Sequence, residues 1–201
     1  MAADAMARAG LRVTIFERMP SAGRKFLMAG RGGLNLTHTE PIDGFLSRYA
    51  DAAAWLGPAI RRFSPNHVRL WADRHDEDTF VGSSGRVFPR SFKASPLLRA
   101  WLRELSELGV ALETRRHWTG WGDSGVLRFA DGSHAAADVC VLALGGASWP
   151  RLGADGNWVS VLAAKGIEVS PLVASNAGIS CNWSNVTIAR HAGQPLKRIA
   201  V

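Results

Sequence analysis

The sequence has little of the chemistry on which disulfide-stabilised domains and metal sites depend. Its 201 residues include two cysteines, Cys140 and Cys181, and neither lies in a CxxC pair or in a cysteine–histidine spacing typical of zinc. It also has no apolar run of 18 residues and no pattern typical of a signal peptide. We therefore expect no disulfide framework, no metal site and no membrane partner. The expected setting is reducing and cytoplasmic, with Cys140 buried as a small apolar side chain.

Lysine is scarce as well, because 20 of the 24 basic residues are arginines. With 17 acidic residues the net charge is +7, so an anionic partner such as nucleic acid has to be weighed. The arginines are scattered and form no basic run, which favours an ordinary solvated surface over a nucleic-acid site. Apolar residues make up 47% of the chain, enough for a sizeable core.

What the sequence does contain is an alternation of helical and strand patterns. Helices are predicted at residues 1–9, over most of 42–76, at 95–108 and at 155–165, and strands at 11–17 and 110–117. A hairpin is predicted around Asp131-Gly132, and residues 139–144 are typical of a fully buried strand. The glycine-rich residues 18–39 are predicted to form a loop. This alternation predicts an α/β domain with a mostly parallel sheet and a small β-hairpin insertion.

Several aromatic side chains fall within the helical patterns. Trp55, Trp71 and Trp101 are predicted to lie in the core, because each occurs at an apolar position of its helix. His67 and His75 are predicted to lie at the surface of one helix. None of the six histidines forms a nucleophile or metal constellation with a nearby cysteine, serine or carboxylate.

The candidate cofactor site begins with an acid at a strand end. Glu17 ends the strand at 11–17, and an acid in this place accepts hydrogen bonds from the ribose hydroxyls of a dinucleotide. The segment GRKFLMAGRGGLNLTH, residues 23–38, follows it. Its glycines permit close approach of backbone amides to a phosphate or a flat ring, and its cations add positive charge. Taken singly, a solvated carboxylate and a flexible surface loop remain alternatives; their order along the chain favours a cofactor site.

Four segments carry a resemblance to a known family: FERMPSAGRKFLMAGRGGLNLTH, GRVFPRSFKASPLLRAWL, HWTGW and LALGGASWPRLGADG. Together they resemble the BaiN-like family of NAD(P)/FAD-dependent oxidoreductases, and within it a subgroup described only as uncharacterised flavoproteins. The resemblance implies an incomplete Rossmann-like FAD-binding domain of the glutathione-reductase-like class. It also implies hydride or electron transfer through FAD to a small-molecule substrate, with NAD(P)H as a candidate electron donor, and it leaves the catalytic residue unknown.

The resemblance also assigns cofactor-binding positions to this chain. They are Glu17, Arg18, Gly23, Arg24, Lys25, Gly30, Arg31, Gly32, Gly33, Asn35, His117, Trp118, Ala143, Gly145 and Gly146. In this assignment the ribose lies at Glu17, the phosphates at residues 23–25, the flavin at 30–35 and the adenine at 117–118. Trp149 is a further candidate neighbour. The role of residues 85–95 stays open between shaping the substrate side and leading into the next helix.

The resemblance finally leads to an expectation about domain organisation. The family begins with an apolar strand and a GxGxxG loop, so residues 1–174 are expected to form a partial FAD-binding domain without them. Residues 175–201 are expected to begin a truncated, inserted second domain. Two alternatives remain: a non-catalytic chain that cannot hold FAD because its strands lack a shared neighbour, and a basic flavoprotein of the tRNA-modifying type.

Overall fold

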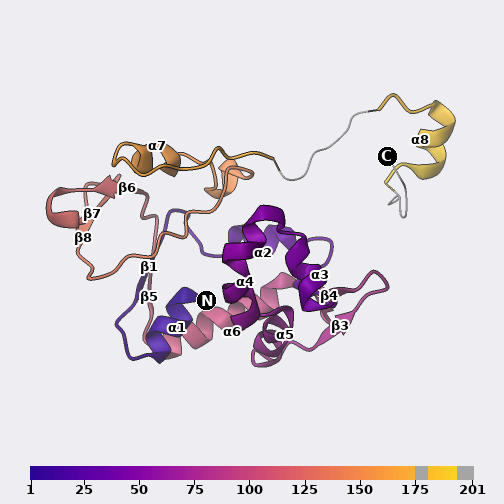
Figure 1. Cartoon of the computed structure of the whole chain (residues 1–201), viewed down its shortest axis with the longest axis horizontal. Coiled ribbons are helices and arrows are strands. Elements are labelled where there is room, and N and C mark those ends of the chain that lie inside the picture. Colours follow the sequence, from indigo (N-terminus) through magenta and orange to yellow (C-terminus); the bar gives the residue numbers. More distant parts are fainter. Residues whose placement is uncertain (175–180, 194–201) are drawn as a thin grey trace. The chain divides into compact units, whose positions relative to one another are not determined.

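The computed structural model describes residues 1–174 and 181–193 (Figure 1). The chain divides into two compact units, Met1–Ser170 and Pro171–Val201. The described part of the second unit contains one helix, α8 (Asn185–His191), which begins where the Ser184 hydroxyl accepts a hydrogen bond from the Thr187 amide at 3.1 Å. The remaining parts of the predicted second domain, residues 175–180 and 194–201, lie outside the described residues.

The first unit alternates helices and strands as predicted, which confirms the α/β class. Its helices are α1 (Ala2–Arg8), α2 (Arg24–Ala29), α3 (Ile42–Ser47), α4 (Ala53–Arg62), α5 (Pro65–Asp73), α6 (Ala94–Glu107) and α7 (Trp158–Ala163). Its strands are β1 (Thr14–Glu17), β2 (Thr37–His38), β3 (Thr79–Val81), β4 (Arg86–Pro89), β5 (Ala111–Thr114), β6 (Trp118–Trp121), β7 (Leu127–Phe129) and β8 (His134–Ala135). Among the described residues, no helix is both long enough and apolar enough to cross a bilayer.

A parallel strand pair and the helices beside it form one part of the core. β1 and β5 run parallel, with Thr14 opposite Ala111 and Glu17 opposite Thr114. The helix α6 directly precedes β5 in the chain, and α1 lies next to α6 (Figure 1). The buried side chains of Val13, Leu105 and Val110 are packed here, as the apolar faces predicted for residues 1–9 and 95–108 require. In the described chain, parallel pairing is confined to these two strands.

Two antiparallel sheets complete the first unit. One has the strand order β2-β4-β3 and the other β6-β7-β8. In the second sheet β7 and β8 form the hairpin predicted around Asp131-Gly132, with Arg128 opposite His134. Arg116 attaches this hairpin to β5. Its guanidinium donates hydrogen bonds to the carboxylates of Glu113 and Asp131, both at 2.8 Å, and to the Ser133 hydroxyl at 2.6 Å.

The largest buried cluster lies where α5 and α6 meet the segment after α2. It contains Leu34, Trp71, Ala72, Ala94 and Leu97, with Phe26, Leu36 and Trp101 packed against it. The core positions predicted for Trp71 and Trp101 are therefore confirmed. The core position predicted for Trp55 is wrong, because its side chain is 73% exposed. Gly57 is the buried residue of α4, and Trp55, two positions earlier, lies about 200° away around the helix.

His75 was predicted to lie at the surface and is instead buried. It follows the end of α5, and the chain there folds back against α6. Its Nδ1 donates a hydrogen bond to the Trp71 carbonyl at 2.7 Å, and its Nε2 lies 2.7 Å from a carboxylate oxygen of Glu104. Both ring nitrogens therefore have polar neighbours, which is the condition under which a histidine can leave water.

The glycine-rich residues 18–39 are not one loop, as predicted, because they contain α2 and β2. The sequence RKFLMA between Gly23 and Gly30 consists of residues with good to moderate helix propensity. Gly23 and Gly30 therefore flank a short helix and do not interrupt it. Gly23 has the positive φ of 72° that a residue with a side chain rarely adopts.

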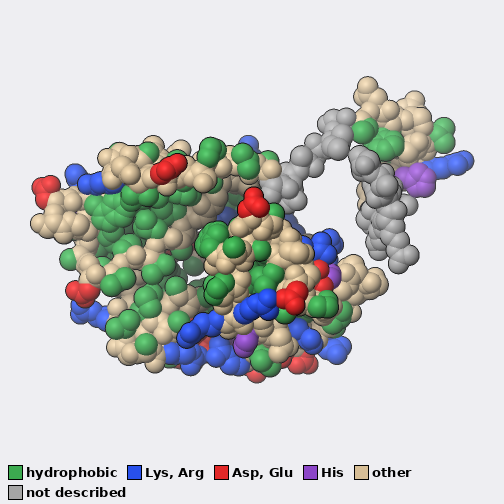
Figure 2. All heavy atoms as spheres, viewed as in Figure 1, with side chains coloured by type: hydrophobic (Ala, Val, Ile, Leu, Met, Phe, Trp, Pro, Cys, Tyr) green, Lys and Arg blue, Asp and Glu red, His purple; other side chains and the backbone are tan. Residues whose placement is uncertain are grey.

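The strand predicted at residues 139–144 is absent, and this expectation is wrong. Val139 is 77% and Val141 is 55% exposed, and Cys140, predicted to be buried, is exposed as well. A strand needs a neighbour that satisfies its backbone groups, and no described residue pairs with this segment. Hydrophobic side chains surround a hollow on the face of the first unit shown in Figure 2.

Candidate functional site

The carboxyl end of β1 places Glu17 in a fixed turn. One oxygen of its carboxylate accepts a hydrogen bond from the Met19 amide at 2.8 Å. The Glu17 carbonyl accepts another from the Arg116 amide at 2.9 Å, and the Met19 carbonyl accepts one from Arg115 at 3.2 Å. Among the described residues, the other carboxylate oxygen of Glu17 has no hydrogen-bond partner. The half-buried side chain can therefore accept a further hydrogen bond from a ligand.

The loop at residues 150–156 is fastened to this strand end. The Arg18 guanidinium donates a hydrogen bond to Asp155 at 2.6 Å, and the Lys25 ammonium donates one to the Leu152 carbonyl at 3.2 Å. The bond from Arg18, together with one from the Asn157 amide, holds the pKa of Asp155 below its usual value. Arg18 and Lys25, both predicted to contact the cofactor, thus already hold this loop.

Asp155 is a site residue that the sequence reasoning missed. Its other oxygen accepts a hydrogen bond from the Asn157 amide at 3.1 Å, two residues further along the chain. Aspartate is favoured in such turns because its short side chain reaches the backbone two residues on. The segment GADGN carried this signal, with an aspartate between two glycines.

The glycine loop, residues 30–33, packs against the first residue of α6 and the turn before it. A Cβ atom added at Gly30 would lie 2.5 Å from the Cβ of Ala94 and 3.1 Å from its backbone nitrogen. One added at Gly33 would lie 3.2 Å from the Phe92 ring. Gly30 and Gly33 therefore permit close packing within the protein, whereas a Cβ at Gly32 would meet nothing within 4 Å. The contacts also show that residues 85–95, whose role was open, support this loop.

The other predicted residues around the glycine loop remain available to a ligand. Arg24 is half-buried at the start of α2, and Arg31 and Asn35 are exposed. In the described part of the chain, neither arginine has a carboxylate within ion-pair distance. Gly23, at the same helix end, is packed against Leu98 of α6. Arg24, at the start of α2, and Arg31, in the glycine loop, are therefore cations available to an anionic ligand.

His117 and Trp118 lie just beyond the residues that pair with β1. The His117 carbonyl accepts a hydrogen bond from the Ala130 amide at 2.8 Å, and Trp118 lies opposite Phe129 in the hairpin sheet. The Trp118 ring contacts that of Trp121 edge to face, with centroids 4.8 Å apart. The structure thus brings both residues to the Glu17 end of β1, with the His117 carbonyl engaged in the sheet.

Ala143, Gly145 and Gly146 lie in irregular chain and not at a strand end. The Gly145 carbonyl accepts a hydrogen bond from the Trp158 indole at 3.1 Å. A cavity of about 290 Å³ adjoins them, lined by Leu142, Ala143, Leu144, Gly145, Trp158 and Leu162. Trp149, 50% exposed, exchanges backbone hydrogen bonds with Ala154.

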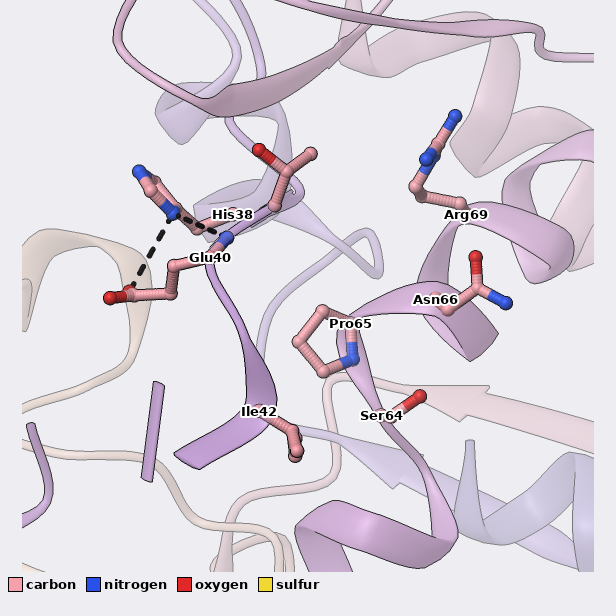
Figure 3. A pocket seen from close by; sticks show the side chains of 8 residues that line it. His38, Glu40, Ile42, Ser64, Pro65, Asn66 and Arg69 are labelled. Atoms are coloured by element: carbon pink, nitrogen blue, oxygen red, sulfur yellow. Dashed lines mark hydrogen bonds and ion pairs between the residues drawn. The ribbon is translucent and has the colours of Figure 1, made fainter. Parts of the chain in front are cut away.

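A second cavity, of about 240 Å³, lies between the segment after β2 and the beginning of α5 (Figure 3). His38 donates from Nε2 to the Ser84 carbonyl at 2.9 Å and accepts at Nδ1 from the Glu40 amide at 3.0 Å. The Arg48 guanidinium bonds both oxygens of Glu40 and lowers the pKa of that carboxyl. In Figure 3 the polar ends of Asn66 and Arg69 point away from His38 and Glu40, so these groups do not converge on one ligand.

The donor set at the end of β1 fits a dinucleotide cofactor. A half-buried carboxylate with an unoccupied oxygen suits ribose hydroxyls, and cations without ion-pair partners suit phosphates. Gly32 leaves its backbone open to close approach by a flat or anionic group. The arrangement offers a hydrogen-bond acceptor and positive charge to a ligand, whereas no described residue of this set forms a nucleophile–base pair.

Two comparisons with known proteins identify relatives of this chain. A family model described as "HI0933-like protein Rossmann domain" matches residues 1–190. A 3-dehydro-bile acid delta(4,6)-reductase from Clostridium scindens is 28% identical over 171 residues. The aligned region covers 81% of this chain and 39% of the relative, so the chain matches well under half of the length of that protein.

Proposed function

Since the chain belongs to the HI0933-like Rossmann domain family, we propose that it is a flavoprotein oxidoreductase that binds FAD. The family confirms the resemblance drawn from the sequence motifs and the Rossmann-like fold class. A reductase at 28% identity supports oxidation–reduction as the reaction class. The substrate is a small molecule, and NAD(P)H is the candidate electron donor.

The observation that carries the proposal is the set of free polar groups on Glu17, at the carboxyl end of β1, and on the glycine-rich segment that follows it in the chain. Glu17 keeps one carboxylate oxygen without a hydrogen-bond partner, and Arg24 and Arg31 keep no ion-pair partner, within the part of the chain that the structure describes. Ligands of open α/β sheets bind at this edge. A pyrophosphate with a ribose on one side and a flavin on the other matches a carboxylate followed by two cations.

When bound, FAD would supply the hydride or electron chemistry, and the residues of the chain would bind and orient it. Glu17 would accept hydrogen bonds from the adenosine ribose, and Arg24 would lie nearest the phosphates. Arg31 would add positive charge on the flavin side, where negative charge on a reduced ring is stabilised. The bonds of Arg18 and Lys25 to residues 152–155 would keep the loop in place beside the cofactor.

A second candidate follows from the exposure of residues 139–144. Val139 and Val141 are largely in solvent, and Gly145 lies at a cavity wall in irregular chain. While residues 139–144 stay irregular, Gly145 and Gly146 present no ordered backbone to a cofactor. The second candidate is therefore a non-catalytic chain with weak or absent FAD binding.

The test is the visible absorption of the purified chain after incubation with FAD and removal of free flavin. We expect a bound flavin band, and an affinity lowered about 10- to 100-fold by Glu17→Gln, since a hydrogen bond to a charged group contributes roughly 1.5–3 kcal/mol. Glu168→Gln is the matched control, because Glu168 is exposed and has no hydrogen-bond or ion-pair partner among the described residues. A colourless wild-type chain would establish the non-catalytic candidate in place of the proposal.

A further inference from the structure

The turn before α6 holds a phenylalanine in a conformation that phenylalanine seldom adopts. Phe92 has a φ of 55°, in the left-handed region that favours glycine. Its side chain is nevertheless 52% exposed, so burial of the ring offsets only part of the free-energy cost of this backbone conformation. Backbone strain of this kind persists where the surrounding structure enforces it, and it gathers at ligand sites.

The surrounding structure enforces the turn through every backbone amide of residues 90–93. The Arg90 amide donates to the Asp78 carbonyl at 2.8 Å, and the Phe92 amide donates to the Pro89 carbonyl at 3.0 Å. The Ser91 amide donates to the Glu77 carboxylate at 3.2 Å, and the Lys93 amide donates to the Ser91 hydroxyl at 3.2 Å. Glu77 is only 6% exposed, so a buried carboxylate holds an exposed turn.

The same turn fixes the Phe92 ring beside the glycine loop. The ring centroid lies 5.0 Å from that of Phe80 and 6.0 Å from that of Phe88. Its Cδ1 lies 3.2 Å from the position of a Cβ at Gly33. One part of the ring is therefore supported by protein, and the rest is open to solvent next to the loop assigned to the cofactor.

The charges on these two segments have one sign. Arg31, Arg90 and Lys93 are all exposed, and none has an ion-pair partner among the described residues. The sequences GRGGLN (30–35) and RSFKAS (90–95) contain no acidic residue. An exposed aromatic ring on segments that carry exposed cations and no acid favours a ligand that is both flat and anionic.

We propose that Phe92 is a recognition residue for the substrate, on which a flat, anionic ring compound such as an aromatic or conjugated carboxylate stacks. The Phe92 platform is the exposed ring of Phe92 together with Arg31, Arg90 and Lys93. Its assignment to the substrate rests on the proposed function, because it lies beside the loop expected to hold the flavin. The binding of a flat anion can be measured without the cofactor.

The probe is 2-naphthoate, whose fluorescence anisotropy rises when it binds the full chain. Cyclohexanecarboxylate keeps the charge without the flat ring, and 2-naphthalenemethanol keeps the ring without the charge. We expect 2-naphthoate to bind more tightly than either compound. Phe92→Gly should weaken its binding about tenfold or more, Phe92→Trp should retain it, and Arg90→Gln should weaken it less than Phe92→Gly.

A stability measurement separates recognition from a packing role. Phe92→Gly removes a half-exposed ring but relieves the positive φ, so we expect the thermal midpoint to stay within about 4 °C of the wild type. Phe63→Ala, at a phenylalanine 44% exposed on another element, should leave naphthoate binding unchanged. Equal binding by the wild type and Phe92→Gly, or an equal loss in Phe63→Ala, would overturn the proposal.

The FAD test of the proposed function and the 2-naphthoate test of the Phe92 platform have independent outcomes. A colourless chain that binds 2-naphthoate through Phe92 removes the proposed function and leaves the platform as a site for flat anions. A chain that holds FAD but binds naphthoate equally well with and without Phe92 leaves the proposed function and removes the platform.

Discussion

Residues 87–89 and residues 139–144 are both short apolar runs followed by a turn, yet the first belongs to a largely buried strand, β4, and the second is irregular and exposed. Val87 is 0% exposed in β4, whereas Val139 is 77% exposed. The difference lies in their neighbours. β4 is hydrogen-bonded on both sides, to β2 and β3, and no described residue pairs with 139–144.

This contrast shows what hydrophobic sequence can and cannot specify. Apolar, β-branched residues make a segment suited to a sheet, but the backbone groups must find partners before the segment leaves water. Where neighbouring elements supply contacts, as at Leu34, Val87, Ala94 and Leu97, the apolar side chains are buried. The segment after residue 138 keeps its apolar side chains without such contacts.

The largest effect is expected where Gly30 packs against Ala94. Gly30→Ala would place a Cβ 2.5 Å from the Cβ of Ala94, against backbone that cannot move freely, and should lower the free energy of unfolding by about 2–3 kcal/mol. Gly32→Ala, two residues further along with open space around it, should change it by less than about 0.5 kcal/mol. Urea unfolding of both variants measures the difference, and similar midpoints would mean that the packing around Gly30 is loose.

A smaller effect compares the two apolar runs directly. Val87→Thr introduces a hydroxyl into the fully buried strand and should lower the free energy of unfolding by about 1–2 kcal/mol. Val139→Thr should change it by less than about 0.5 kcal/mol, because this side chain already lies in water. If Val139→Thr proves as destabilising as Val87→Thr, residues 139–144 are packed in solution and the contrast between the runs disappears.

The smallest effect concerns the ion pair that joins the end of β1 to the loop at residues 150–156, which follows the irregular segment. The Arg18 guanidinium lowers the pKa of Asp155 in the native chain, so the pair stabilises that chain above the unfolded pKa of about 3.9. This contribution is lost as the pH falls through the lower, native pKa. Arg18→Gln should raise the Asp155 pKa toward its ordinary value, which a carbon-13 titration of the carboxyl group measures.

Lys25→Gln is the control for this titration. It removes a contact to the same loop, at the Leu152 carbonyl, without touching the carboxylate. The Asp155 pKa should therefore stay where it is in the wild type. If the Asp155 pKa does not change in Arg18→Gln, the hydrogen bond from the Asn157 amide alone lowers it.

Structural features that depend on residues close together in the chain were predicted correctly from the sequence. The apolar spacing of residues 95–108 predicted α6, and Asp131-Gly132 predicted the hairpin of β7 and β8, because both patterns are local. That Glu17 and the glycine-rich segment together bind a cofactor stays a prediction.

Structural features that depend on contacts between residues distant in the chain were not predicted from the sequence. The burial of His75 depends on Glu104, 29 positions away, and the roles of Gly30 and Gly33 depend on Ala94 and Phe92. The exposure of Trp55 depends on which face of α4 the rest of the unit covers. No local pattern marked Phe92, because its positive φ results from hydrogen bonds to residues 77, 78 and 89.

The attachment of the hairpin at Arg116 has a consequence for how the chain responds to ionic strength. One partly exposed guanidinium bonds two carboxylates and a hydroxyl, and it lies 5.8 Å from the centre of the Phe129 ring. Interactions of this kind weaken as dissolved ions screen them, whereas the backbone pairing of β1 with β5 is largely indifferent to salt. The neighbouring Arg116 amide belongs to that backbone pairing, through its bond to Glu17. Raising the salt concentration should therefore loosen the hairpin while leaving the strand end that carries Glu17 in place.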